Sequence, residues 1–247
     1  MEHILDTGKI RLSIFKNTND PKESKNWNFS MSTNSEDEDE IDRSFNEVCD
    51  QATHYVKGHC KVLCMVKDDP HITSNSIDYS FQRGFSRPRM WAQYADNHSG
   101  ICFIFDREKL EKTIKSALSA KGDIYFDDVT YRNFNPDQVH AFSLSHEEIQ
   151  KNSLESVLNE KVKLHYKQYF FTKAEDWSSE NEWRCILRGN DSEAEFIPIK
   201  DSICGIIVGN NFPNVYVPSI THFGKKYSVE VARIHWSNGV PIILPIQ

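Results

Sequence analysis

The chain has 247 residues, of which 38% are hydrophobic and 12% aromatic, and its formal net charge is -7. The aromatic content argues against intrinsic disorder, and the acidic balance does not suit a protein that wraps duplex DNA. The six cysteines, several inside apolar runs, suit reduced thiols in a cytosol, and no apolar run reaches the ~20 residues of a membrane span.

We therefore expect a single cytoplasmic domain over residues 1–247 that makes no contact with a membrane. Residues 4–13 (ILDTGKIRLS) predict the end of a short helix, a glycine turn and a strand. Residues 17–23 (NTNDPKE) predict a turn, because Asn and Asp bond their own backbone and Pro21 restricts φ. Residues 32–42 carry six acidic side chains, which indicates a solvated acidic loop.

The middle of the chain alternates strands with one long loop. Residues 60–66 (CKVLCMV) predict a buried strand, and residues 68–89, with two prolines and no clean period, predict a long surface loop. Residues 100–105 (GICFIF) form a continuous apolar run, which predicts a central strand covered on both faces. Asp106 then caps a helix to about residue 119, with an apolar stripe made of Leu110, Ile114 and Leu118.

The C-terminal half completes the pattern. Ser145 and Glu148 form a capping box that opens the longest helix, over residues 146–168. The predicted strands cover residues 123–131, 181–188, 195–199, 203–208 and 228–235, and the run 203–208 is a second central strand. Since helices and strands do not alternate regularly, we expect an α+β fold with a mixed or antiparallel central sheet and flanking helices.

One segment with unusual chemistry is DWSSENEWR, residues 176–184. With a strand period of 2, Glu180, Glu182 and Arg184 point away from the core. Two carboxylates this close repel each other unless a cation, metal or ligand hydroxyl lies between them, and their proximity raises one pKa. Lys173 and Trp177 add a cation and an aromatic ring, so the segment indicates either a polar-ligand site or a solvated strand face with ion pairs.

The second such segment is MWAQYADNHSG, residues 90–100. Trp91 and Tyr94 are spaced i, i+3 and would form one aromatic wall of a ligand site, or else anchor the turn on the sheet. His98 is either a ligand-binding or a capping histidine. We expect the two segments to converge in space, with Tyr94 and Glu182 on the same side of the molecule. For metals we predict no site, because Cys60 and Cys64 have no second ligand pair at zinc-finger spacing.

Three motifs in this order, NDPKE (19–23), RMWAQYADNHSGICFIFD (89–106) and KAEDWSSENEWR (173–184), resemble the bacterial family named domain of unknown function 2971. The resemblance runs from about residue 4 to residue 209. It implies a role in conflict with phage, of the abortive-infection kind, and a partner protein from a defence operon.

The chain also resembles the ADP-ribosyltransferase fold, in its IL-x-x-G-x-I-x-x-S start, aromatic turn and late strand-borne glutamate. This resemblance implies that NAD is the substrate, that Glu182 holds the ribose and that Glu180 positions the acceptor. Trp91 or Tyr94 would stack on nicotinamide. The strand that contacts NAD in that fold would precede residue 4, so either His3 takes its role or the pocket is incomplete.

The function that we predict is a phage-defence effector that uses NAD, as an ADP-ribosyltransferase or an NAD glycohydrolase. Its catalytic residues are Glu182 and Glu180. Its ligand-binding residues are Trp91, Tyr94, His98, Lys173, Trp177 and Arg184. The acceptor is a protein or a nucleic acid. Two alternatives stay open: a non-catalytic module that senses a ligand or phage, and a metal-dependent nuclease built on Glu180, Glu182 and Lys173.

Overall fold

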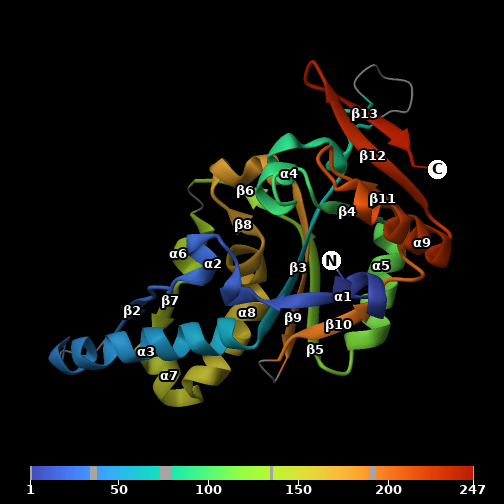
Figure 1. Ribbon diagram of the computed structural model, residues 1–247. Helices are drawn as coiled ribbons and strands as arrows, with labels where there is room; N and C mark the ends of the chain where they lie inside the picture. The colour runs from blue at the N-terminus through green and yellow to red at the C-terminus, as the bar shows by residue number, and fades with distance from the viewer. Residues whose placement is uncertain (1, 34–37, 73–78, 134–135, 190–192, 247) are drawn as a thin grey trace.

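Two β-sheets organise the chain (Figure 1). The computed structural model describes residues 2–33, 38–72, 79–133, 136–189 and 193–246. The larger sheet is antiparallel throughout and has the order β10-β1-β3-β9-β5. Its strands are β1 (Lys9–Ile14), β3 (Cys60–Val66), β5 (Gly122–Asp128), β9 (Glu182–Gly189) and β10 (Glu195–Pro198).

The smaller sheet has the order β13-β12-β11-β4, in which only the β11–β12 pair is parallel. Its strands are β4 (Ile101–Phe105), β11 (Ile203–Val208), β12 (Glu230–Ser237) and β13 (Val240–Pro245). Two short parallel pairs join β2 (Ser30–Ser32) to β7 (Ser143–Ser145) and β6 (Thr130–Tyr131) to β8 (Thr172–Lys173).

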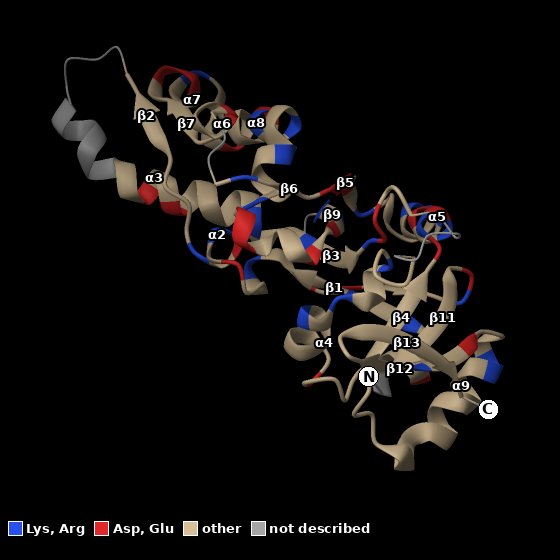
Figure 2. Ribbon diagram, turned by 90° about the horizontal axis from the view of Figure 1, so that it is seen from above, with Lys and Arg blue, Asp and Glu red and all other residues tan. Residues whose placement is uncertain are grey.

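Helices gather at both ends of this arrangement, with α3, α7 and α8 at one end and α9 at the other (Figure 2). The α-helices are α1 (Glu2–Thr7), α2 (Pro21–Ser24), α3 (Glu38–Gly58), α4 (Pro88–Tyr94), α5 (Arg107–Leu118), α6 (Asp137–Ala141), α7 (His146–Asn152), α8 (Leu154–Phe170) and α9 (Val217–Tyr227). The 3-10 helices are η1 (Phe15–Asn17), η2 (Gly84–Ser86), η3 (Glu175–Glu180) and η4 (Asn214–Tyr216). Among the described residues, none of these helices combines the length and apolar character needed to cross a membrane.

Strand β9 lies between two hydrophobic cores. Trp183, Cys185 and Leu187 pack into the core that contains the apolar stripe of α5. Ile186 points the other way, into a second core formed with α3 and α8. Because both faces of the sheet are covered, a side chain of β9 has no solvated face to occupy.

The α+β class with a largely antiparallel sheet and flanking helices is confirmed, and so are most predicted strands. Asp106 caps α5 by accepting from the Lys109 amide at 3.0 Å. Within the described part of residues 68–89, the predicted loop holds only η2 and the start of α4, whereas residues 73–78 lie outside the described residues.

Three predictions about elements are wrong, and they concern the acidic loop 32–42, the single helix 146–168 and the central position of the run 100–105. The acidic loop 32–42 is helical from Glu38, where α3 begins, although residues 34–37 lie outside the described residues. The single helix 146–168 is two helices, because Ser153 has φ +68° and caps α8 by accepting from the Ser156 amide. The predicted capping box holds in part, since Ser145 accepts from the Glu148 amide at 3.3 Å.

The run 100–105 is not a central strand. Strand β4 forms the edge of the smaller sheet, and all five of its residues are half-buried. The other apolar run, β11, is internal as predicted, and Ile206 is 1% exposed. The apolar composition of β4 arises because its two faces pack against two different cores. A strand can be covered on both faces in this way and still lie at the edge of its sheet.

Candidate functional site

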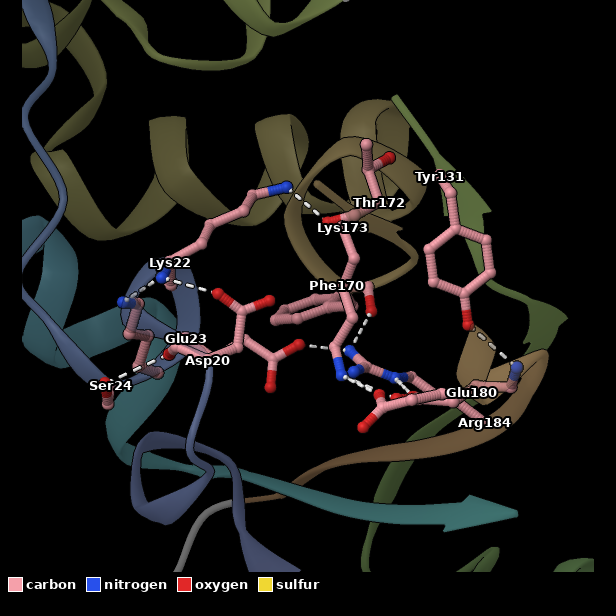
Figure 3. A network of polar contacts seen from close by, with 12 residues as sticks. Asp20, Lys22, Glu23, Ser24, Tyr131, Phe170, Thr172, Lys173, Glu180 and Arg184 are labelled. Atoms are coloured by element: carbon pink, nitrogen blue, oxygen red, sulfur yellow. Dashed lines mark hydrogen bonds and ion pairs between the residues drawn. The ribbon is translucent and has the colours of Figure 1, made fainter. Parts of the chain in front are cut away.

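Side chains from distant segments meet in one buried group of charges, part of which Figure 3 shows. We call this group the ionic cluster and define it as Glu23, Lys173, Glu180, Glu182 and Arg184. Each member keeps only 1–4% of its surface exposed. Buried ions are tolerated when they are paired, because an unpaired ion costs several kcal/mol of desolvation.

Lys173 holds the two central carboxylates together. Its Nζ donates to Glu180 Oε2 at 2.8 Å and to Glu182 Oε1 at 2.5 Å. The same ammonium lies 4.9 Å from the centre of the Trp177 ring. A shared cation therefore offsets the repulsion between the carboxylates. A cation was one of the three groups that the sequence analysis expected between them.

Arg184 connects this pair to the N-terminal part of the chain. Its Nε donates to Glu182 Oε2 at 2.5 Å, and its Nη1 donates to Glu23 Oε1 at 2.5 Å. Nη1 also donates to the carbonyl of Phe170 at 2.9 Å. One planar guanidinium thus sets the orientation of Glu182, which a flexible lysine would do less well.

The two motif segments converge, as predicted. The Tyr94 hydroxyl donates to Glu180 Oε1 at 2.6 Å and accepts from Asn19 Nδ2 at 3.0 Å. Behind the cluster, the backbone N–H of Glu182 donates to the Tyr131 hydroxyl at 2.8 Å. Tyr94 is 52% exposed, so it marks the boundary between the ionic cluster and solvent.

Local backbone chemistry explains how these side chains reach the cluster. Asp20 caps α2 by accepting from the Lys22 amide at 2.8 Å, and Pro21 begins the helix, which carries Glu23 inward. Asn181 has φ +45°, a left-handed conformation that asparagine tolerates. That residue ends η3 and starts β9, so Glu180 and Glu182 approach Lys173 from two different elements.

The two carboxylates differ in acidity. Burial raises the pKa of Glu180, and the hydrogen bond with Glu182 raises it further. Burial alone would also raise the pKa of Glu182, but its hydrogen bond with Glu180 and the charge of Arg184 outweigh burial and lower this pKa to about 2. The pKa of Glu180 is thus raised while that of Glu182 is lowered, so Glu180 is the more basic carboxylate of the pair.

Two cavities open beside the ionic cluster. The polar cavity, of about 550 Å³, is lined by all five cluster residues together with Asn19 and Tyr94. The apolar cavity, of about 560 Å³, lies between β3 and β4 and is lined by Phe85, Trp91, Phe103 and Trp183 among others. The two share Cys64, Met65, Val66, Met90 and Tyr94, and both fall in the range of about 300–1,000 Å³ that ligand pockets occupy.

Two buried atoms of the cluster retain unused hydrogen-bonding capacity. Among the described residues, Glu23 Oε2 and Arg184 Nη2 have no hydrogen-bond partner. Both residues line the polar cavity. A polar group of a ligand there would satisfy an acceptor and a donor at once.

The other predicted ligand-binding residues divide into two kinds. Trp91 is 3% exposed, donates from Nε1 to the Phe85 carbonyl at 2.6 Å and packs in a core, while one side lines the apolar cavity. His98 lines neither cavity, and its ring lies 6.3 Å from that of Trp236. Trp91 and Tyr94 therefore do not form a single aromatic wall. Trp91 anchors a core, Tyr94 lies at the site, and His98 lies away from the site.

Of the two alternatives for this segment, the solvated strand face is wrong. Glu182 and Arg184 are buried because α2 and α8 cover that face of β9, and Glu180 belongs to η3 and not to the strand. Although Glu182 was expected to point away from the core, its side chain lies in the protein interior for the same reason. The side chain of His3 lies outside the described residues.

Sequence reasoning missed Glu23, Asn19 and Tyr131. Asn19 and Glu23 belong to the NDPKE motif, which predicts a turn and carries part of the family resemblance but gives no sign of a ligand site. A glutamate in the first turn of a helix is common, so nothing in the sequence around Glu23 indicates that this residue is buried. For Tyr131 we see no signal in the sequence at all.

One comparison with known proteins gave a match. Residues 90–185 match the model of a family described as "Protein of unknown function (DUF2971)". This segment is shorter than the predicted 4–209, and it includes Tyr94, Lys173, Glu182 and Arg184 but not Glu23. No curated protein matched the chain, and no solved structure matched it.

Proposed function

We propose that this chain is an enzyme that consumes NAD, breaking the bond between nicotinamide and ribose and passing ADP-ribose to a macromolecule or to water. The Glu180–Glu182 pair carries the proposal. Two buried carboxylates beside one ammonium have pKa values moved in opposite directions, at a cavity large enough for a nucleotide. A permanently ionised carboxylate beside a carboxyl of raised pKa is the arrangement used for cleavage of glycosidic bonds.

In the proposed reaction, the bond between ribose C1′ and the nicotinamide nitrogen breaks, and its electron pair leaves with nicotinamide. The positive charge that develops on the ribose is stabilised by the Glu182 carboxylate, which Arg184 and Lys173 hold in place. An acceptor oxygen or nitrogen then attacks C1′ and transfers its proton to ionised Glu180. Because the pKa of Glu180 is raised, its ionised form is a stronger base than an ordinary glutamate.

The test is release of nicotinamide from NAD, measured by chromatography, with and without a bacterial extract as the acceptor. Glu182→Gln and Glu180→Gln should each lower the rate by about 10²–10³. Glu175→Gln is the matched control, because Glu175 lies in η3 but outside the ionic cluster and both cavities. If the folded wild-type chain releases no nicotinamide under either condition, the NAD proposal is overturned.

In the cell we propose a role as a phage-defence effector, which acts with a partner protein of its operon. Expression in a bacterial host should deplete NAD and slow growth, and Glu182→Gln should relieve the effect. Phage challenge of the same two strains then measures protection. Equal plaque counts with and without the wild-type chain would contradict the defence role and leave the chemistry untouched.

One observation favours a second candidate, a non-catalytic module that senses a ligand. Every member of the ionic cluster is already paired within the protein, which suits a site that responds to a ligand by exchanging contacts. Such a module would show a higher melting temperature with NAD but no turnover. The metal-dependent nuclease is disfavoured by the geometry, because Lys173 Nζ occupies the position between the carboxylates where a metal would bind.

A further inference from the structure

Glu23 and Arg184 differ from the other members of the ionic cluster because each keeps one polar atom free. Arg184 Nη1 donates to Glu23 Oε1, an ion pair drawn in Figure 3, and Arg184 Nε donates to Glu182. Glu23 Oε2 and Arg184 Nη2 have no partner in the described part of the chain. Since buried polar atoms are nearly always bonded, a free acceptor and a free donor at one place indicate that a ligand completes them.

Both residues belong to the wall of the polar cavity. Glu23 is 2% exposed and Arg184 is 1% exposed, and both line this cavity of about 550 Å³. Oε2 shares its carbon with Oε1, and Nη2 shares its carbon with Nη1, so the free acceptor and the free donor flank the bond that joins the two side chains. The capped helix α2 carries Glu23, and β9 carries Arg184 in a ladder with β3. The pair therefore offers an acceptor and a donor in a fixed arrangement.

The complement of this arrangement is a planar group with an N–H donor next to an acceptor oxygen. A primary carboxamide has both, whereas a carboxylate has only acceptors. The ionic cluster contains three carboxyl groups against two cations. A further anion beside Glu23 Oε2 is therefore repelled, because like charges at close range disfavour each other. The site thus selects a neutral amide over the corresponding acid.

We propose that Glu23 and Arg184 determine specificity by binding the carboxamide of nicotinamide. The amide nitrogen donates to Glu23 Oε2, and the amide oxygen accepts from Arg184 Nη2. The identity of this ligand rests on the proposed function, in which nicotinamide is the leaving group of NAD. Arg184 also bonds Glu182 through Nε, so one guanidinium holds the leaving group beside the carboxylate that stabilises the ribose. Nicotinic acid, which has a carboxylate in place of the carboxamide, is rejected.

The first test compares the binding of free nicotinamide and free nicotinic acid to the wild-type chain. Neither compound contains the bond that the proposed reaction breaks, and ligand-observed NMR detects weak complexes of both. Nicotinamide should bind at least about tenfold more tightly, because a site that accepts from an N–H group rejects an analogue without one. Equal affinity for the amide and the acid would contradict the inference.

Substitution Glu23→Gln tests the residue itself. The side-chain oxygen keeps the bond from Arg184 and the new –NH2 group takes the place of Oε2, so an acceptor becomes a donor. The preference for nicotinamide over nicotinic acid should fall at least about tenfold. Glu195→Gln is the matched control, because Glu195 is also buried and paired with a lysine, Lys121, but lines neither the polar nor the apolar cavity.

Melting curves establish that both variants fold, and the comparison on the wild-type chain decides the question if Glu23→Gln does not. Adenine and ribose are titrated as well, since each also combines donors with acceptors. An unchanged preference in the folded variant would refute the role of Glu23. Binding of adenine or ribose that depends on Glu23, with binding of nicotinamide that does not, would refute the carboxamide as its partner.

A kinetic test separates this inference from the proposed function. The kcat/KM for NAD is divided by the kcat/KM for nicotinic acid adenine dinucleotide, in wild type and in Glu23→Gln. Comparing the two ratios removes the intrinsic difference between the leaving groups, and the ratio should fall at least about tenfold in the variant. An equal ratio would overturn the inference and leave the proposed function intact. No turnover of either dinucleotide, with nicotinamide still bound through Glu23, would overturn the proposed function alone.

Discussion

Tyr94 and Glu180 lie 86 positions apart in the chain, yet the hydroxyl of the first donates to Oε1 of the second at 2.6 Å. This bond joins the half-exposed end of α4 to a carboxyl that is 1% exposed. It is the point at which the surface meets the ionic cluster, and it makes the acidity of Glu180 dependent on a residue that a ligand can reach.

Substitution Tyr94→Phe removes this bond and the one from Asn19. The Tyr94 hydrogen bond lowers the pKa of Glu180 against the larger effect of burial, so its loss raises this pKa further. If ionised Glu180 accepts the proton, the rate should rise with pH and the midpoint of that rise should move to higher pH. Tyr79→Phe, which removes an exposed hydroxyl bonded to Arg83, is the control for the pH profile. A midpoint that does not move would show that Tyr94 does not influence the pKa of the group that accepts the proton.

Substitution Glu182→Gln should reduce stability as well as activity. The side chain accepts from both Lys173 and Arg184, and its neutralisation leaves each of these buried cations with one carboxylate in place of two. Breaking a buried ion pair costs about 3–5 kcal/mol. The measurement is urea unfolding of the variant and of Glu175→Gln, which should lose less than about 1 kcal/mol as an exposed substitution. Equal stability of the two variants would mean that the ionic cluster contributes nothing net to folding.

Stability should depend on pH through Glu182. Its pKa of about 2 in the folded chain lies below the ordinary value of about 4.3 for glutamate. Its contribution is therefore complete above about pH 4.3 and is lost as the pH falls toward 2. Glu180, whose pKa is raised, contributes in the opposite direction: its share is present at low pH and is lost as the pH rises through that pKa.

The difference in unfolding free energy between wild type and Glu182→Gln isolates the first of these contributions. We expect this difference to be larger at pH 6 than at pH 2.5. A difference that does not change between the two would show that Glu182 is not an ionised, stabilised carboxylate in the folded chain.

Substitution Trp91→Ala should act on folding. Trp91 is 3% exposed and donates to the Phe85 carbonyl, and truncation of a buried tryptophan costs about 3–5 kcal/mol. Tyr216→Ala, at a residue that is 50% exposed, provides the comparison. The measurement is the melting temperature of both variants. If Trp91→Ala is as stable as Tyr216→Ala, Trp91 does not act in folding and its predicted role in ligand binding is favoured.

Much of the fold was predictable from local pattern. The stripe Leu110, Ile114 and Leu118 and the cap Asp106 predicted α5, because helix period and capping are properties of a few neighbouring residues. Alternation along residues 181–188 predicted β9 but allowed its second face to be solvated. A period of 2 identifies two faces, and it does not tell what covers the polar one.

What the sequence by itself determined is the set of local elements, the α+β class, and the two segments in which ionisable and aromatic residues are concentrated. Tertiary structure alone decided that Glu23 meets Arg184 across 161 positions, that the carboxylates share Lys173, and that β4 lies at an edge. The physical reason is that local preferences act over a few residues, whereas charge pairing and strand order depend on which distant segments pack together. The acidity of Glu180 and Glu182 follows from that packing, since burial and neighbouring charges exist only once the chain has folded.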